Sequence, residues 1–593
     1  MSLLRADRLL VLSLGFSLAL GVPAASAQDF EQIRPPAVGR PFEEALDPSI
    51  ETDSKDEQVV LPPLPESLRR DGAGAGPGAG GQTEGTGEGS APASTIRISG
   101  LAIEGNTVVE DAAFIEAAKP FLDRELSAAE VEALRDTLTR VLVDSGLRTS
   151  GAVFPEQAVR RDGVLKVRIV EGVLASVEVQ GEHFVSSGYY AARLAPRDGE
   201  PLDIPRLEER IRRLQRDPRL KAIHATIRPG DVPGESVLEV SVDEASPLAA
   251  FAEVNNRVSP NLGEVRGSVG LANRSMFGFG DELRLTGDLS EAGGGIEARY
   301  EFPLHGSGTT LAAQGRYRAF DLSDGIGREL GIESEFWSAE LGIRQPFFPT
   351  REWSFSLGVS GDLRESKIAD WEGSDFVDFP ILGAKNSRTR VAAIRFFADA
   401  TLRQTDRVIA MRSVASFGIK AFGATRNDGD LPESQFASWY VQAQAVQRVT
   451  DWKIELVAKT SFQLSDRNLF GLEQFAIGGD ASLRGYRQNQ LVRDEGAQGT
   501  VEVRVPLIRG AVDGRSLLQG VVFADAGRVW SRHRLSDNDR AVSLASVGLG
   551  ARFLIRPHFR GEVYWAHGFR DLAQDGNSLQ DDGIHFRFIT VWP

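Results

Sequence analysis

The feature that most constrains the fold of this chain is an alternation of apolar and polar side chains that runs from about Pro247 to the end of its 593 residues. From Ile296 to Phe302, apolar residues at even positions alternate with Glu and Arg, and Val501 to Val505 shows the same pattern at odd positions. A period of two is that of a β-strand, whose side chains point alternately to opposite faces. One segment, Leu363 to Thr389, alternates weakly and clusters Asp, Gly and Pro, so we expect a long loop there.

The length and the charges of this region favour a membrane barrel over a soluble β-sandwich. Alternation alone fits both folds, but a region from residue 247 to residue 593 is very long for one sandwich. Its polar faces repeatedly carry Arg and Glu, as expected for the wall of a water-filled lumen. At about 20 residues for each strand and its loop, the region would hold about 16 strands. We therefore predict a mainly β fold with a transmembrane β-barrel of about 16 strands over residues 248–593.

Composition argues against several other classes of protein. The chain has no cysteine, so neither a disulfide framework nor a thiolate metal site can form. Its net charge of −16 argues against nucleic-acid binding, which usually shows a basic patch. Past the N-terminus no apolar run reaches about 18 residues, so no transmembrane helix is expected. Acidic pairs such as Asp581-Asp582 lie in a polar loop, where a solvated surface is the simpler interpretation. We expect no enzyme activity, no catalytic residue, no metal and no cofactor.

The N-terminal part of the chain reads as an export signal followed by a linker. Residues 1–27 carry Arg5 and Arg8 near their start, continue with an apolar run from Leu9 to Gly21 and end on Ala25-Ser26-Ala27, the small-residue pattern of a signal peptidase site. Residues 28–95 are rich in Pro and Gly and cannot bury enough apolar surface to offset chain entropy. We expect a flexible linker, in which Phe42 to Leu46 could begin a short plug helix.

Between the linker and the alternating region, one order of elements occurs twice. Residues 96–172 predict a strand, two helices and two strands, and the second helix opens with a capping box formed by Ser127 and Glu130. Residues 173–247 repeat the order, with apolar residues at helical spacing between Ile204 and Gln215. Two consecutive β-α-α-β-β units of similar length indicate an internal repeat.

Two short motifs near the C-terminal end offer a lone cation and a lone anion. Arg484 lies in the run Leu-Arg-Gly-Tyr on a Gly-flanked loop, and Asp525 lies in the strand-like run Phe-Ala-Asp-Ala-Gly. A guanidinium can bind a carboxylate through two parallel hydrogen bonds, and a buried arginine needs such a partner. If the two meet inside a water-filled barrel, they would pin a long loop to its wall. From each motif alone, an ordinary strand aspartate and an ordinary loop arginine remain equally good interpretations.

These motifs, with Gly478-Gly479 before the first, resemble those of the two-partner secretion transporters, also called TpsB or hemolysin activation/secretion proteins. That family belongs to the superfamily of POTRA-bearing outer-membrane barrels, and the two β-α-α-β-β units resemble its two periplasmic POTRA domains. The resemblance covers nearly all of the mature chain. The chain departs from the family at Leu483, where valine is usual. It also departs at its end, because barrels of this type usually end in an aromatic residue and Trp592 stands one place before the last residue.

The resemblance implies roles for two groups of residues. In such transporters the arginine motif lies at the tip of the sixth extracellular loop, which folds back into the lumen, and the aspartate motif lies on an inward strand face. The implied structural latch consists of Arg484, Gly485 and Tyr486 with Phe523, Asp525 and Gly527. The POTRA domains would capture a partner, and strand addition to an exposed sheet edge suits this task because main-chain hydrogen bonds do not depend on sequence. The candidate edge consists of Thr149, Ser150, Gly151, Ala152, Val153 and Phe154.

The function that the resemblance implies is type V secretion. A monomeric transporter, surrounded by the lipids of a Gram-negative outer membrane, would bind a large exoprotein in unfolded form and export it through the barrel. The exoprotein would be a TpsA-like adhesin or cytolysin, and no nucleic acid would take part. Two alternatives stay open from the residues. One is an insertase of outer-membrane proteins, whose members often have more POTRA units, and the other is a passive porin, which would lack the repeats.

Overall fold

The computed structural model describes residues 95–592, apart from residues 158–162, 182–183, 198, 322–331, 348–349, 351, 371–381, 450–451, 510–515, 536–539, 556–557 and 573–576. The predicted signal peptide, most of the Pro/Gly-rich linker and the candidate helix at Phe42 to Leu46 lie outside the described residues. The chain divides into two compact units between Ala245 and Ser246. Both β-α-α-β-β repeats lie before this boundary and the alternating region lies after it. The two repeats and the alternating region are described in turn below.

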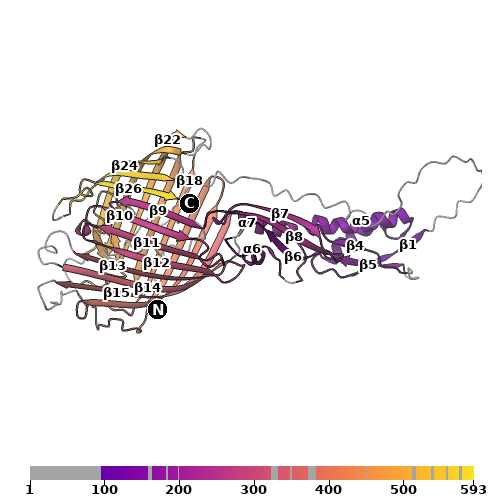
Figure 1. Cartoon of the computed structure of the whole chain (residues 1–593), viewed down its shortest axis with the longest axis horizontal. Helices are drawn as coiled ribbons and strands as arrows, with labels where there is room; N and C mark the ends of the chain where they lie inside the picture. Colours follow the sequence, from indigo (N-terminus) through magenta and orange to yellow (C-terminus); the bar gives the residue numbers. More distant parts are fainter. Residues whose placement is uncertain are drawn as a thin grey trace, which may run out of the picture. The chain divides into compact units, whose positions relative to one another are not determined.

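The first β-α-α-β-β unit folds into a small sheet covered by helices (Figure 1). Its elements are β1 Ile96–Ile98, β2 Gly100–Glu104, α4 Asp111–Ala118, η3 Lys119–Phe121, β3 Arg124–Leu126, α5 Ala128–Asp144, β4 Gly151–Val153 and β5 Val164–Val170. The sheet has the order β2-β5-β4, with β2 parallel and β4 antiparallel to β5. The predicted capping box is present at the start of α5, where Ser127 and Glu130 bond to each other's backbone N–H groups. Three leucines of α5, Leu134, Leu138 and Leu142, are buried in the core beneath it.

One strand of this unit is not predicted by the alternation. The apolar run that starts at Ile96 breaks at Ser99, whose N–H donates to the carbonyl of Gly163 (2.9 Å). The first part, β1, then pairs with β3 and not with the main sheet. The turn into β3 is made by Asp123, which has a φ of 60° and donates its N–H to the carbonyl of Ile98 (2.8 Å). Aspartate is among the residues that tolerate this left-handed conformation.

The second unit repeats the topology of the first. Its elements are β6 Val173–Gln180, α6 Ser187–Leu194, α7 Ile204–Gln215, β7 Leu220–Pro229 and β8 Glu235–Glu244. The sheet has the order β6-β8-β7, again with the first strand parallel to the last and the preceding strand antiparallel to it. Four apolar residues of α7, Ile204, Leu207, Ile211 and Leu214, face the core at the predicted helical spacing. The repeat in sequence is therefore a repeat in structure.

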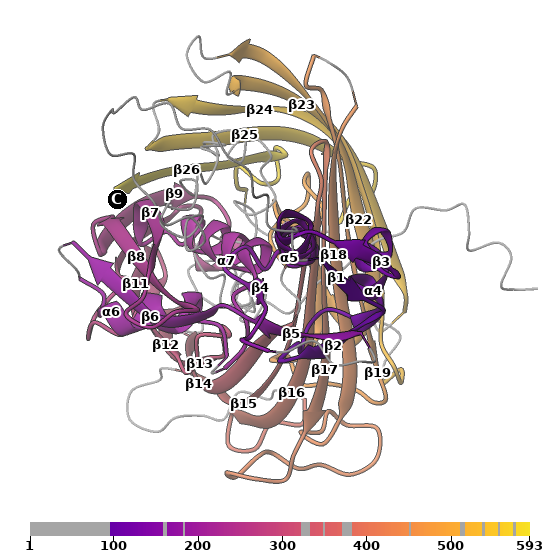
Figure 2. The ribbon, with the colours of Figure 1, turned by 90° about the vertical axis from the view of Figure 1, so that its right-hand side faces the viewer.

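The C-terminal unit is a closed antiparallel barrel of 16 strands, as predicted. The strands are β9 Leu248–Asn255, β10 Arg266–Asn273, β11 Glu282–Ser290, β12 Gly293–Pro303, β13 Thr310–Asp321, β14 Ile332–Phe347, β15 Trp353–Asp370, β16 Arg388–Arg403, β17 Arg407–Gly418, β18 Ala437–Arg448, β19 Glu455–Ser465, β22 Glu495–Arg509, β23 Ser516–Trp530, β24 Val542–Ile555, β25 Phe559–Gly568 and β26 Ile584–Trp592. The last strand pairs with the first, with Trp592 opposite Ala250, so no sheet edge remains open. Figure 2 shows the strands curving around a common interior.

The alternation sorts side chains between the two faces of the barrel. On β23, Val522 is exposed outward while Phe523 and Asp525, on the opposite face, are buried. On β22, Val501 and Val503 are exposed while Glu502 and Arg504 are buried. An apolar outer face and a charged inner face are what a bilayer and a polar lumen require. Among the described residues, no helix is long and apolar enough to cross a membrane.

The expected loop from Leu363 to Thr389 is wrong in its first part. Strand β15 continues to Asp370 and stays in register with β14, so that Ile368 lies opposite Ser334. Polar residues occupy both faces of this part of the strand, and their charges are paired, as Glu365 is with Arg390 and Lys367 is with Glu335. Apolar alternation is lost there although the ladder of backbone hydrogen bonds continues.

Candidate functional site

The connection between β19 and β22 folds into the barrel. It spans residues 466–494 and is the sixth of the connections that join β9 to β10, β11 to β12 and so on at one end of the barrel. A short hairpin forms its middle, with β20 (Phe475–Ile477) paired to β21 (Leu491–Arg493). Buried side chains of this loop pack against Val529 of β23 and Leu544 of β24, and they are Phe475, Ile477, Leu483 and Tyr486. We call this segment the sixth loop.

The structure brings the two sequence motifs together. Arg484 donates from Nε to Oδ2 of Asp525 (2.9 Å) and from Nη2 to Oδ1 (2.8 Å), which is the two-pronged pairing expected of an arginine and a carboxylate. The backbone N–H of Arg484 also donates to Oδ2 of Asp525 (3.1 Å). The two residues are only 3% and 2% exposed. This pairing joins the sixth loop to β23.

A second carboxylate, Glu502 of β22, completes the surroundings of the arginine. Arg484 donates from Nη1 to Glu502 (2.8 Å), whose other oxygen accepts two hydrogen bonds from Arg504 (3.0 and 2.8 Å). Two guanidinium groups thus face two carboxylates. Burial alone would lower the pKa of Arg484, but Asp525 and Glu502 outweigh it and raise the pKa above its ordinary value. The arginine therefore stays charged inside the barrel.

Aromatic rings fix the plane of the guanidinium. The Cζ atom of Arg484 lies 3.3 Å from the ring centre of Phe523 and 5.0 Å from that of Tyr564 on β25. The rings of Phe523 and Tyr564 meet edge to face, with centres 5.8 Å apart. A cation over an aromatic face is stabilised by the ring quadrupole, more so when it is shielded from water. Phe523 is thus a platform for Arg484.

The two glycines of the motifs make room for close approach. Gly485 has a φ of +85°, and an added Cβ would lie 3.1 Å from the carbonyl oxygen of Ala566 and from the backbone nitrogen of Gly568. Its own N–H donates to Nε2 of His585 on β26 (3.0 Å). At Gly527, a Cβ would lie 3.0 Å from Cδ1 of Leu483. Any larger residue at either position would push the loop tip away from the wall.

Tyr486 and its neighbours extend the contact of the loop tip. The Tyr486 hydroxyl donates to the carbonyl of Ala545 on β24 (2.9 Å) and accepts from the N–H of Arg570 (3.2 Å). Arg487 forms two hydrogen bonds of 2.6 Å with Asp581 in the connection before β26. The tip is therefore bound to the barrel wall and to a neighbouring connection.

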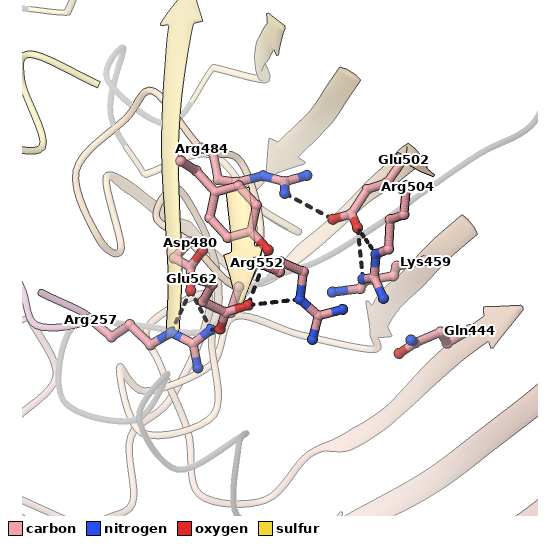
Figure 3. A pocket seen from close by; sticks show the side chains of 11 residues that line it. Arg257, Gln444, Lys459, Asp480, Arg484, Glu502, Arg504, Arg552 and Glu562 are labelled. Atoms are coloured by element: carbon pink, nitrogen blue, oxygen red, sulfur yellow. Dashed lines mark hydrogen bonds and ion pairs between the residues drawn. The ribbon is translucent and has the colours of Figure 1, made fainter. Parts of the chain in front are cut away.

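Beside Arg484 lies a small cavity lined by charged side chains (Figure 3). Arg257 pairs there with Asp480 of the sixth loop and with Glu562 (3.1 Å), and Arg552 lies 3.5 Å from Glu562. Each carboxylate of the lining faces at least one cation. Within the described part of the chain, no group of three or more His, Cys, Asp or Glu residues could hold a metal ion. The arrangement is suited to holding a loop in place.

Sequence reasoning did not find Glu502 or Tyr564. Both lie on inward faces of alternating strands, which the pattern did indicate. The pattern does not give the register in which β22 pairs with β23. That register places Glu502 opposite Phe523 and so next to Arg484.

The candidate capture edge lies where the first small sheet ends. Gly151–Val153 form β4, an edge strand of the order β2-β5-β4. The outward N–H of Ala152 already has a partner, because it donates a hydrogen bond to the hydroxyl oxygen of Thr139 from α5 (3.1 Å). Ser150 accepts from the N–H of Gly172 (2.8 Å), and the side chain of Val153 is exposed. Thr149 and Phe154 flank the strand.

Two families of known proteins match this chain. Residues 384–553 match the family described as "Haemolysin secretion/activation protein ShlB/FhaC/HecB", and residues 96–172 match "POTRA domain, ShlB-type". The first match contains both Arg484 and Asp525. In both segments this chain is similar to the ShlB/FhaC/HecB haemolysin secretion/activation proteins. The resemblance inferred from the motifs is thereby confirmed.

Individual relatives agree with the family. The outer membrane transporter CdiB of Escherichia coli O6:K15:H31 is 22% identical over 413 residues, which cover 67% of this chain and 67% of the relative. The heme/hemopexin transporter protein HuxB of Haemophilus influenzae is 20% identical over 451 residues, covering 73% of this chain and 76% of the relative. The solved structure of CdiB from Escherichia coli has a TM-score of 0.63 at 20% identity over 86% of this chain and 93% of that chain. This likeness shows the fold.

These matches decide between the functions left open by the sequence. The chain is an outer-membrane transporter of two-partner secretion in a Gram-negative bacterium, with its POTRA domains in the periplasm, and it is not an enzyme. The insertase and the passive porin are set aside.

Proposed function

We propose that this transporter binds one large exoprotein in unfolded form with its POTRA domains and exports it through the barrel. The observation that carries this proposal is the presence in one chain of a ShlB-type POTRA domain and a barrel of the ShlB/FhaC/HecB family. The exoprotein would be TpsA-like, an adhesin or a cytolysin. A single chain would suffice, since the 16 strands close on themselves.

The division of labour within the chain follows from this proposal. Residues 96–172 and 173–247 would be two POTRA domains, and their shared topology supports this division. Residues 248–593 would be the pore. The contacts of Arg484, Gly485 and Tyr486 with β23, β24 and β26 would hold the sixth loop against the wall, so we assign these residues to a latch with Phe523, Asp525 and Gly527.

Deleting the gene is expected to remove one large protein from the culture medium, and the intact chain supplied in trans should restore it. The reason is that this exoprotein would have no other route across the outer membrane. Quantitative proteomics would measure the secreted proteins in the medium and the abundance of other barrels in the outer membrane. Loss of many other barrels with an unchanged medium would contradict secretion and point to an insertase.

A photo-cross-linking residue at Val153 is expected to label the exported protein during secretion. Val153 is 47% exposed and lies on the edge strand β4. A strand added at this edge would lie beside it, because main-chain pairing sets neighbouring strands about 4.8 Å apart. Ile115 of α4, which is 46% exposed, provides the matched control on a helix. Equal labelling from both positions would argue against capture at this edge.

A further inference from the structure

The sixth loop is held to the barrel at a second place, on the amino-terminal side of β20. Glu473 accepts a hydrogen bond from Nη2 of Arg395 on β16 (2.7 Å) and lies 3.6 Å from Nη1 of Arg364 on β15. Glu473, Arg364 and Arg395 are all buried. A carboxylate of the loop thus meets two cations of the wall, and none of the three belongs to the contacts of Arg484.

The cations at this place share a second carboxylate. Asp362 of β15 accepts from Nε of Arg395 (2.6 Å) and from Nε of Arg364 (2.7 Å). The remaining Nη1 of Arg395 donates to the hydroxyl of Ser416 on β17 (2.7 Å). Two guanidinium groups therefore balance two carboxylates, and every nitrogen of Arg395 has a partner. We name Asp362, Arg364, Arg395 and Glu473 the stem anchor.

Apolar packing surrounds the stem anchor. Three loop residues before Glu473 are buried in one cluster with side chains of β14, β16 and the residue before β18. The cluster consists of Leu469, Phe470, Leu472, Phe336, Val391, Ala393 and Phe436. The carbonyl of Leu472 also accepts from Nη1 of Arg364 (3.4 Å). Such packing keeps water from the ion pairs and strengthens them.

The stem anchor and the contacts of Arg484 lie on different parts of the wall. Arg484 binds side chains of β22, β23 and β25, whereas Glu473 binds β15 and β16, and β17, β18 and β19 separate the two groups in the barrel. The two groups share no residue, and each balances its own charges. Interactions without shared partners are expected to contribute independently.

We propose that Glu473 is a positioning residue that holds the stem of the sixth loop to β15 and β16 independently of Arg484. When the tip leaves β23, the stem stays in place, and the loop turns about Glu473 instead of leaving the lumen as a whole. This inference goes beyond export itself, and its test on purified protein needs no exoprotein.

Spin labels at two single cysteines would separate the two ends of the loop, since the chain has no cysteine of its own. Gly471→Cys reports on the stem, because it is exposed and a Cβ there meets no atom within 4 Å. Ala481→Cys reports on the tip and is also exposed. In the full-length protein, Glu473→Gln is expected to shorten the rotational correlation time of the label at position 471 and not at 481. Arg484→Ala is expected to do the reverse.

Two further variants make this test decisive. Asp466→Asn removes an exposed acid of the same loop outside the stem anchor and should leave both labels unchanged. Arg395→Lys keeps the charge but loses the fork that binds Asp362 and Glu473 together, so it should mobilise the label at 471 as Glu473→Gln does. Heat-modifiable migration in gels would confirm a folded barrel in each case. An unchanged label at 471, or equal mobilisation at 471 and 481, would overturn the proposal.

Discussion

Replacing Arg484 by alanine is expected to lower secretion of the exported protein and to raise the conductance of the barrel in a planar bilayer. The substitution leaves Asp525 without its guanidinium partner and removes one of the two cations at Glu502. Breaking a buried ion pair costs about 3–5 kcal/mol. Because about 1.4 kcal/mol corresponds to a tenfold change in population, the docked loop would become at least about a hundredfold less populated relative to undocked states.

Two companion variants test whether the ion pair itself is responsible. Arg484→Lys keeps the charge but cannot bind Asp525 through two parallel hydrogen bonds. Its secretion and conductance should therefore lie between those of the wild type and those of Arg484→Ala. Asp525→Ala combined with Arg484→Ala removes both partners. The double change should destabilise the docked loop by less than the sum of the two single changes. Normal secretion together with normal conductance in Arg484→Ala would count against a latch.

Gly485→Ala is expected to release the loop tip although it removes no charge. The φ of +85° is unfavourable for alanine by roughly 1–2 kcal/mol. The new Cβ would also lie 3.1 Å from the carbonyl oxygen of Ala566, tighter than ordinary contact, so the tip must move away from β25. We expect the population of the docked loop to fall about tenfold or more, and this should be measured as increased conductance and reduced secretion.

Gly471→Ala is the matched control for this prediction. It changes a glycine of the same loop where an added Cβ meets no atom within 4 Å. Conductance and secretion should stay at the wild-type level. If both glycine variants behaved alike, the close approach of Gly485 to β25 would have no special role in holding the loop.

The barrel and the helical repeats could be predicted because each depends on a local period. Alternation specifies which side chains of a strand face inward, and it does so wherever one face meets lipid, as at Val501 to Val505. It fails where both faces are polar, which is why the outer part of β15 resembled a loop. The pairing of β1 with β3 was hidden for a related reason, since three-residue strands carry too few alternations to be recognised.

The candidate site could be predicted only in part. The pairing of Arg484 with Asp525 was implied by the resemblance of their motifs to those of two-partner secretion transporters, because each motif alone fits an ordinary loop arginine or strand aspartate equally well. Glu502 gave no such signal, since charged residues alternate along most inward faces. Glu473 was hidden as well, because its partners Arg364 and Arg395 lie far away in the sequence and meet it only when the barrel closes.

The hydrogen bond that the N–H of Ala152 donates to the Thr139 hydroxyl affects how tightly β4 could bind an added strand. An incoming strand must displace this hydroxyl before it can accept from that N–H, so the edge exchanges one hydrogen bond for another. Binding at such an edge is weakened by the fold's own side chain, and its reversal is correspondingly easier. At the capture edge that we propose, weaker binding would help the exoprotein to move onward, because tight capture would slow every later step of export.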